Sequence, residues 1–294
     1  MKLNLLKRIR TYQKERFPLV VLLLSLVPAI LSSGAVVGGV VHLVPLLCAV
    51  VVSVAYLAHI RIIDEQRDYL HDNEYHKTRP IQAGVITLSE LRTIDLGIVV
   101  LILAVSFSLG LIPLITSLVL IAYSYLAGRE FFLGERLRSH FFLYNSVNLL
   151  QMVLMQVLVY AMFGLSTLPT ALIVLHFLFT TSGTLIFEFL RKVKIPGEDG
   201  TGKDTYTWYV PFGRALWIYF LLFLVTVSLF FLLILHTQIN QYWWMWIGII
   251  EVCSALFWTI LHSTQKTHKT EQALQGSFLL NYAILNMIIY FAII

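Results

Sequence analysis

Charged residues are scarce in this chain of 294 residues: 13% are Asp, Glu, Lys or Arg, whereas 58% are hydrophobic. A soluble globular domain has roughly 25% charged residues, so the composition excludes an ordinary soluble domain. Cysteine is scarce too, because the chain has only Cys48 and Cys253, both in apolar stretches. Two such cysteines provide neither a disulfide framework nor a Cys/His metal site. Together with a mean hydropathy of +0.80, these absences indicate a polytopic membrane protein.

Long apolar runs recur along the chain, each long enough, or nearly so, to cross about 30 Å of hydrocarbon. Their approximate ranges are residues 17–33, 39–60, 93–110, 112–127, 141–164, 168–190, 214–236, 242–262 and 276–294. A backbone exposed to lipid must satisfy its own hydrogen bonds, and the runs lack the alternation of barrel strands. The sequence therefore predicts an all-α polytopic bundle of nine transmembrane helices, which we expect to form one domain over residues 1–294.

The 21 Lys and Arg residues fall on one side of the predicted bundle, because every second connection has none of them. The positive-inside rule places the charged loops and a basic segment, residues 1–16, in the cytoplasm, with the C-terminus outside. We expect the protein to lie in the inner membrane of a bacterium. The net charge of +5 reflects cytoplasmic loops, so we expect no nucleic-acid partner. In the alternative interpretation, the first helix is a signal peptide that ends near residues 32–35.

Residues 64–80, "DEQRDYLHDNEYHKTRP", crowd carboxylates at the end of the second apolar run. On a helix, Asp64, Asp68 and Asp72 would lie on one face, with Glu65 beside them, and like charges at this spacing destabilise the helix. The compensating charge could come from nearby basic residues, namely Arg61, Arg67, Lys77 and Arg79, or from a divalent cation such as Mg²⁺. A solvated helix end at the membrane surface is the alternative.

The order of these residues resembles the first aspartate-rich motif of the UbiA-type membrane prenyltransferases, Asn-Asp-x-x-Asp-x-x-x-Asp followed by Arg-Pro-x-x-x-Gly. Asp64 stands at the Asn position, Glu65 at the first Asp, and Asp68 and Asp72 at the other two. Arg79, Pro80 and Gly84 match the remainder. The motif's place after helix 2 and the number of helices also agree, so the resemblance covers the whole chain.

This resemblance implies an enzyme that transfers a prenyl group from an allylic prenyl diphosphate to a lipophilic or aromatic acceptor with the help of Mg²⁺. Asp68, Asp72 and Arg79 would be catalytic, Glu65 would bind Mg²⁺ together with the two aspartates, and Asp64 would contact substrate. No pattern in the sequence selects the acceptor.

The family's second motif, Asp-x-x-x-Asp after helix 6, is altered in this chain. Glu188 takes the first acidic position, but Lys192 stands at the second. Either Glu198 or Asp199 completes a second metal site with Glu188, or Arg191 and Lys192 bind the diphosphate directly. A basic loop end that anchors at lipid headgroups is the alternative.

Two further segments supply candidate substrate contacts. Tyr123 and Arg129 resemble residues that the family places near the diphosphate at the end of helix 4. Asn145 begins a polar stripe along helix 5 that also includes Asn148, Gln151 and Gln156. Polar side chains within membrane helices face a cavity or other helices, so a substrate pocket and interhelical hydrogen bonds are both open.

Several other residues stay outside the predicted site. Glu251 is an isolated carboxylate in the middle of a predicted helix, and His59, His71 and His76 flank the first acidic stretch without metal-ligand spacing. Two other functions remain: a protein of the same fold that binds a polyprenyl lipid or a quinone without chemistry, and a cation transporter. A transporter would show intramembrane charge along a path and internal repeats, and neither is evident.

Overall fold

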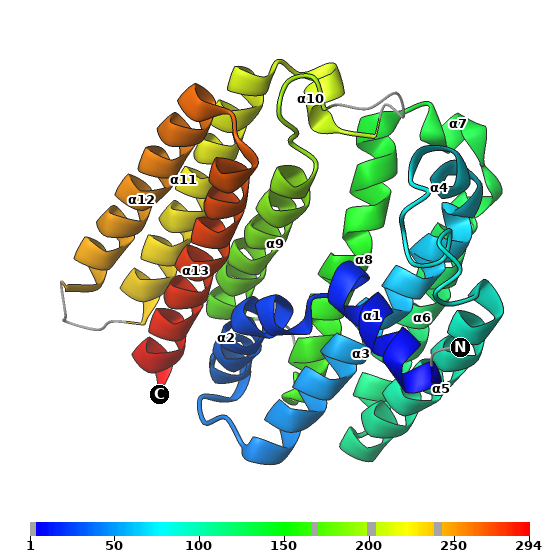
Figure 1. The fold of residues 1–294 in the computed structure, drawn as a ribbon. Helices are drawn as coiled ribbons and strands as arrows, with labels where there is room; N and C mark the ends of the chain where they lie inside the picture. Colours follow the sequence, from blue (N-terminus) through cyan, green and yellow to red (C-terminus); the bar gives the residue numbers. More distant parts are fainter. Residues whose placement is uncertain (1–3, 166–169, 199–203, 238–242) are drawn as a thin grey trace. The chain divides into compact units, whose positions relative to one another are not determined.

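The computed structural model describes residues 4–165, 170–198, 204–237 and 243–294, and within them it contains helices and connecting segments but no strand (Figure 1). Its elements are α1 (Leu5–Arg16), α2 (Leu19–Gly38), α3 (Leu43–Arg67), α4 (Tyr69–Tyr75), α5 (Leu88–Leu109), α6 (Leu111–Gly128), the 3₁₀ turn η1 (Glu130–Phe132), α7 (Glu135–Arg138), α8 (Phe141–Met162), α9 (Ala171–Arg191), α10 (Tyr206–Tyr209), α11 (Phe212–His236), α12 (Trp243–Gln265) and α13 (His268–Ile293).

Nine helices in this part of the chain are long and apolar enough to cross a membrane, which confirms the predicted all-α membrane architecture. Several helices extend past the predicted apolar runs into polar sequence. The last helix begins at His268, earlier than predicted, because Thr267 and Thr270 form a reciprocal cap at its start. Such caps satisfy the free N–H groups of the first turn, so a helix can begin well before its hydrophobic segment.

The helices form two compact units. The first contains α1, the start of α2 up to Leu23, and the helices from α3 to α8. Within it, α3 packs against α5, α6 and α8, and α6 packs against α5 and α8. The second contains α2 from Leu24 onward and the helices from α9 to α13, with α11 packed against α9, α12 and α13.

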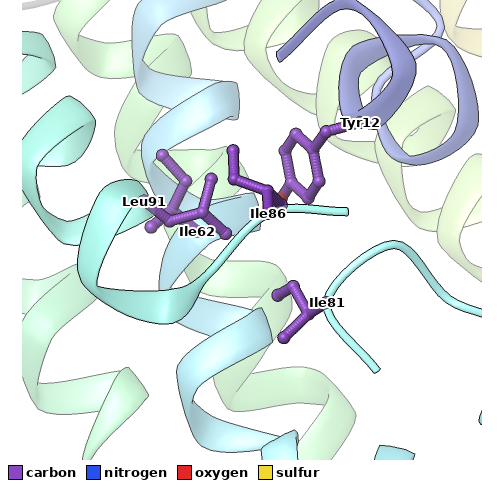
Figure 2. Close-up of a cluster of buried hydrophobic side chains, with 5 residues drawn as sticks. All are labelled: Tyr12, Ile62, Ile81, Ile86 and Leu91. Atoms are coloured by element: carbon purple, nitrogen blue, oxygen red, sulfur yellow. The ribbon is translucent and has the colours of Figure 1, made fainter. Parts of the chain in front are cut away.

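A buried apolar cluster in the first unit fixes the loop that follows α4 (Figure 2). It joins Tyr12 of α1, Ile62 of α3, Ile81 and Ile86 of the loop, and Leu91 of α5. All five side chains are less than a tenth exposed. Because Ile62 precedes Glu65 by one turn and Ile81 follows Arg79, the cluster holds both ends of the acidic segment in place.

Gly84 allows this loop to turn back toward α5. Its φ of +73° lies in the left-handed region that favours glycine. The turn is closed by the N–H of Val85, which donates to the Pro80 carbonyl at 2.8 Å. The chain then enters α5 through a capping box formed by Thr87 and Glu90. The Arg-Pro-x-x-x-Gly pattern is therefore a turn that returns the chain to the membrane.

An aromatic core fills the second unit. Phe179 of α9, Phe223 of α11 and Phe278 of α13 are fully buried, and Tyr282 stacks on Phe179 with ring centroids 5.4 Å apart. Glu251 is also buried, on α12, and Asn281 of α13 donates to its backbone carbonyl at 3.4 Å. Polar groups within membrane helices commonly join neighbouring helices in this way.

Candidate active site on α3 and α4

The helical hydrogen bonding of α3 continues through Asp68 into α4. The N–H of Asp68 donates to the Asp64 carbonyl at 2.8 Å, and the N–H of Asp72 donates to the Asp68 carbonyl at 2.8 Å. Asp68 itself departs from helical geometry, with φ −91° and ψ 6°, so α3 and α4 meet at a kink. The predicted extension of the helix into the acidic stretch is therefore observed, and the three aspartates follow one another by single turns.

Arg67 joins two of these aspartates. Its Nη2 lies 2.8 Å from Asp64 Oδ1, and its Nε donates to Asp68 Oδ1 at 3.0 Å. One guanidinium thus neutralises part of the repulsion between carboxylates one turn apart. This is one of the two compensations that the sequence left open.

Glu65 and Asp72 are the buried members of the acidic stretch, each 2% exposed. Glu65 Oε1 accepts from Arg16 Nε of α1 and from Arg61 Nη2 one turn earlier, both at 2.8 Å. Asp72 accepts from Arg79 Nη1. A buried carboxylate without a partner would be strongly destabilising, so these arginines account for the burial.

The pKa of Asp68 is lower than that of an ordinary aspartate. Burial is the largest single effect and would raise the pKa, but the adjacent Arg67 guanidinium, together with smaller contributions from Arg138 and Arg61, outweighs it. Asp68 is therefore ionised at neutral pH. Arg138 of α7 belongs to the electrostatic surroundings of this carboxylate, a role that the sequence did not suggest.

The α8 side of the cluster is formed by Asn148 and Tyr144. Arg67 Nη1 donates to Asn148 Oδ1 at 3.2 Å, and the Arg67 guanidinium lies over the Tyr144 ring, 5.5 Å from its centroid. Asn145, the predicted substrate contact, is buried and donates from Nδ2 to the Phe141 carbonyl at 2.8 Å. Within the polar stripe on this helix, Asn148 contacts Arg67 of the acidic segment.

Tyr123 and Arg129, the predicted substrate contacts at the end of α6, differ in their surroundings. The Tyr123 hydroxyl donates to the Val147 carbonyl at 2.9 Å and so ties α6 to α8. Arg129 is exposed at the end of α6. The following turn, Glu130–Phe132, has three consecutive residues with φ between +52° and +59°, and its buried Glu130 accepts from Arg138. Left-handed conformation is costly for residues other than glycine, and here it directs the chain toward Arg138.

Three buried polar side chains connect α3, α5 and α6, on the N-terminal side of the acidic stretch along α3. His59 Nδ1 lies 2.6 Å from Asp95 Oδ1, and His59 Nε2 lies 2.7 Å from Ser124 Oγ. All three side chains are almost fully buried. His59, which the sequence analysis leaves outside the predicted site, thus joins three membrane helices.

Gly128 allows α6 to pack close to α3 at Ile63, the residue before Asp64. A Cβ at this position would overlap Ile63 Cγ2. The close approach of the two helices therefore depends on the absence of a side chain at position 128.

In the second unit, Glu188 is surrounded by positive charge. Its carboxylate accepts from Arg191 Nη2 at 2.9 Å and lies 3.1 Å from Lys192 Nζ. Glu198 instead pairs with His268 Nε2 of α13 at 2.9 Å. Asp199, the other predicted ligand, lies outside the described residues. The contacts that we observe therefore give Glu188 basic partners in place of a second acid.

The two motifs differ in the ligand that their side chains suit. Four carboxylates within two and a half turns of α3 and α4 provide the hard oxygen donors that Mg²⁺ prefers, so the first motif fits a magnesium site. At the second motif, two cationic side chains already flank the carboxylate. Arg191 and Lys192 therefore suit an anionic group such as a phosphate.

A mainly apolar groove lies between α12 and α13 in the second unit. Its volume is about 520 Å³, and it is formed by the beginning of α12, including Trp243 and Trp244, and the end of α13, including Met287 and Phe291. Such a surface accommodates hydrocarbon.

No protein-family profile matches the sequence, and no curated protein matches it. Solved structures do match. A structure of digeranylgeranylglyceryl phosphate synthase is 14% identical, with a TM-score of 0.60 over 96% of this chain and 99% of that one. A UbiA homologue from Archaeoglobus fulgidus bound to GPP and Mg²⁺ is 14% identical, with a TM-score of 0.61 over 95% and 99%. The homologue bound to DMAPP and Mg²⁺ is 15% identical, with a TM-score of 0.59 over 96% and 98%. At these identities the likeness shows a shared fold.

Proposed function

We propose that this chain, which has the UbiA-type prenyltransferase fold, is an integral membrane enzyme that transfers a prenyl group from an allylic prenyl diphosphate to a lipophilic or aromatic acceptor. The observation that carries the proposal is the array of paired carboxylates and arginines on α3 and α4. Structures with the same fold have been solved with a prenyl diphosphate and Mg²⁺.

Glu65, Asp68 and Asp72 would hold Mg²⁺, with Asp64 beside them. The bound ion supplies positive charge that stabilises a diphosphate leaving group. Arg67 and Arg79 would add positive charge and N–H donors for the diphosphate, because a guanidinium pairs with phosphate oxygens as it does with carboxylates. Asn148 orients Arg67 through its hydrogen bond.

In the proposed reaction, the C–O bond between the allylic carbon and the diphosphate breaks and both electrons leave with pyrophosphate. The acceptor then forms a bond to the allylic carbon and releases a proton. The chain's part is to position the diphosphate and to stabilise its negative charge. In the second unit, Arg191 and Lys192 are further candidates for contacts with an anionic group.

We also propose an orientation for the chain in a bacterial inner membrane. The N-terminus and the loops rich in Lys and Arg would face the cytoplasm, as the positive-inside rule predicts, and the C-terminus would face outward. A water-soluble diphosphate made in the cytoplasm would then reach the end of α3 directly.

Release of pyrophosphate by the purified protein tests the proposal. Prenyl diphosphates of several chain lengths would be supplied with Mg²⁺ and a membrane extract as the source of acceptor. We expect release that requires Mg²⁺ and disappears in Asp68→Asn. Glu74→Gln is the matched control, since Glu74 is an exposed acid on α4, and it should retain activity. Release by Asp68→Asn at the wild-type rate would overturn the proposed role of the carboxylates.

A second candidate function is binding of a polyprenyl lipid or quinone without chemistry. The pairing of Glu188 with Arg191 and Lys192 favours it, because it leaves the second motif without the acidic pair that the family's pattern has. Retained lipid binding with no pyrophosphate release from any donor would support this function and contradict the transferase.

A further inference from the structure

His71, Asp72 and His76 converge in the first unit, although the spacing of the two histidines along the chain is not typical of metal ligands. One donor atom from each residue lies within 4.8 Å of the others. On a continuous helix, residues five apart would point about 140° away from each other. However, α4 ends at Tyr75, and His76 has φ −133° and ψ 50°. The change of backbone direction brings the His76 ring to within 5.8 Å of the His71 ring, measured between centroids.

The three side chains are held in position before any cation arrives. The His71 ring packs on Tyr75 at 4.7 Å between centroids. The Asp72 carbonyl accepts the His76 N–H at 2.9 Å, and the buried Asp72 carboxylate is fixed through Oδ1 by Arg79. Both histidines are partly exposed. An ion can therefore reach two imidazoles that stand beside an oriented carboxylate.

The donor chemistry selects the cation. Two imidazole nitrogens and one carboxylate oxygen are typical ligands of Zn²⁺ and similar transition metals, whereas Mg²⁺ prefers oxygen ligands alone. Three protein ligands leave a fourth position of a tetrahedral ion for water.

We propose that His71, Asp72 and His76 form a Zn²⁺ site at the end of α4. The site shares Asp72 with the proposed magnesium ligands, so Zn²⁺ and Mg²⁺ would compete for this carboxylate. The competition with Mg²⁺ rests on the proposed function, whereas the binding of Zn²⁺ does not.

The test uses Co²⁺ and Zn²⁺ with the purified full-length protein. Co²⁺ bound by imidazole should produce visible d–d absorption that Zn²⁺ abolishes by displacement. His71→Ala and His76→Ala should each weaken Zn²⁺ binding at least about tenfold. His42→Ala is the matched control, since His42 is exposed in the same unit, and it should bind as the wild type does. Undiminished binding in both His71→Ala and His76→Ala would overturn the proposal.

The experiment must distinguish Zn²⁺ binding at this site from binding at a second group of potential ligands. Glu198, His268 and Glu271 also bring three potential donors within 4.8 Å of one another, so the titrations are repeated with His268→Ala. Binding that persists in His268→Ala but is lost in His76→Ala supports the site on α4, and the reverse result excludes it. Inhibition of pyrophosphate release by Zn²⁺, relieved in His76→Ala, would then test the competition. Absence of all release would reject the proposed function and leave the binding result intact.

Discussion

Lys192 Nζ lies 3.1 Å from Glu188 Oε1, one turn away on α9. This ion pair occupies the place where the second aspartate-rich motif would have two acids. If Lys192 binds diphosphate, Lys192→Asp should raise the KM for the prenyl diphosphate about tenfold, because one phosphate contact is worth roughly 1.4 kcal/mol or more. Lys269→Asp, an equal change of charge at an exposed residue of α13, should leave the KM unchanged. A lower Mg²⁺ requirement in Lys192→Asp would instead indicate an altered metal site.

Arg67 should affect cation and substrate binding in opposite directions. It pairs with Asp64 and Asp68, so Arg67→Gln removes a positive charge that competes with Mg²⁺ and also removes a donor for phosphate. We therefore expect half-saturation at lower Mg²⁺ and a higher KM for the prenyl diphosphate. Steady-state kinetics measure both. Arg92→Gln, on the exposed surface of α5, should change neither, and parallel changes of the two constants in Arg67→Gln would contradict this account.

Asp68 makes the stability of the protein depend on pH. Its pKa in the folded protein is lowered by Arg67 despite the opposing effect of burial. A lowered folded-state pKa adds stability that is fully present above the unfolded pKa of about 3.9 and is lost as the pH falls through the folded value. The difference in unfolding temperature between wild type and Asp68→Asn should therefore be constant from pH 5 to 8 and shrink below about pH 4. A difference in unfolding temperature that grows as the pH falls would contradict the stabilising role of ionised Asp68.

Gly128 should be intolerant of even one methyl group. Gly128→Ala would place a Cβ against Ile63 Cγ2, and the β-branched isoleucine has little freedom to move. We expect a loss of about 1–3 kcal/mol in stability, measured by thermal unfolding in detergent. Gly97→Ala is the control, because no atom lies within 4 Å of that Cβ position. Ile63→Ala should partly rescue Gly128→Ala, and the absence of rescue would mean that another contact is limiting.

Local patterns in the sequence predicted the features that depend on nearby residues. The apolar runs predicted the membrane helices that the structure describes, and the four-residue spacing of Asp64, Asp68 and Asp72 predicted the continuation of α3. Arg67, which pairs with Asp64, was also among the residues that the sequence offered as compensating charge for the acidic stretch. These features follow from helical periodicity alone.

Features that depend on distant residues or on a single backbone angle could not be predicted in this way. Glu65 accepts from Arg16, which lies 49 residues earlier on another helix. Glu198 finds His268 of α13 as its partner. The approach of His71 and His76 depends on the helix ending at one residue, and helix boundaries are the least certain part of a sequence-based prediction.

The four carboxylates paired on α3 and α4 form, with their arginine partners, an array without net charge. Asp64, Glu65, Asp68 and Asp72 are matched by Arg16, Arg61, Arg67 and Arg79. An array without net charge has a smaller solvation penalty near the low-dielectric interior of a membrane than bare carboxylates would have. For the stability of the protein, Asp72 and Arg79, which pair with each other, should therefore be best replaced together, whereas the loss of either one leaves an unpaired charge at the membrane boundary.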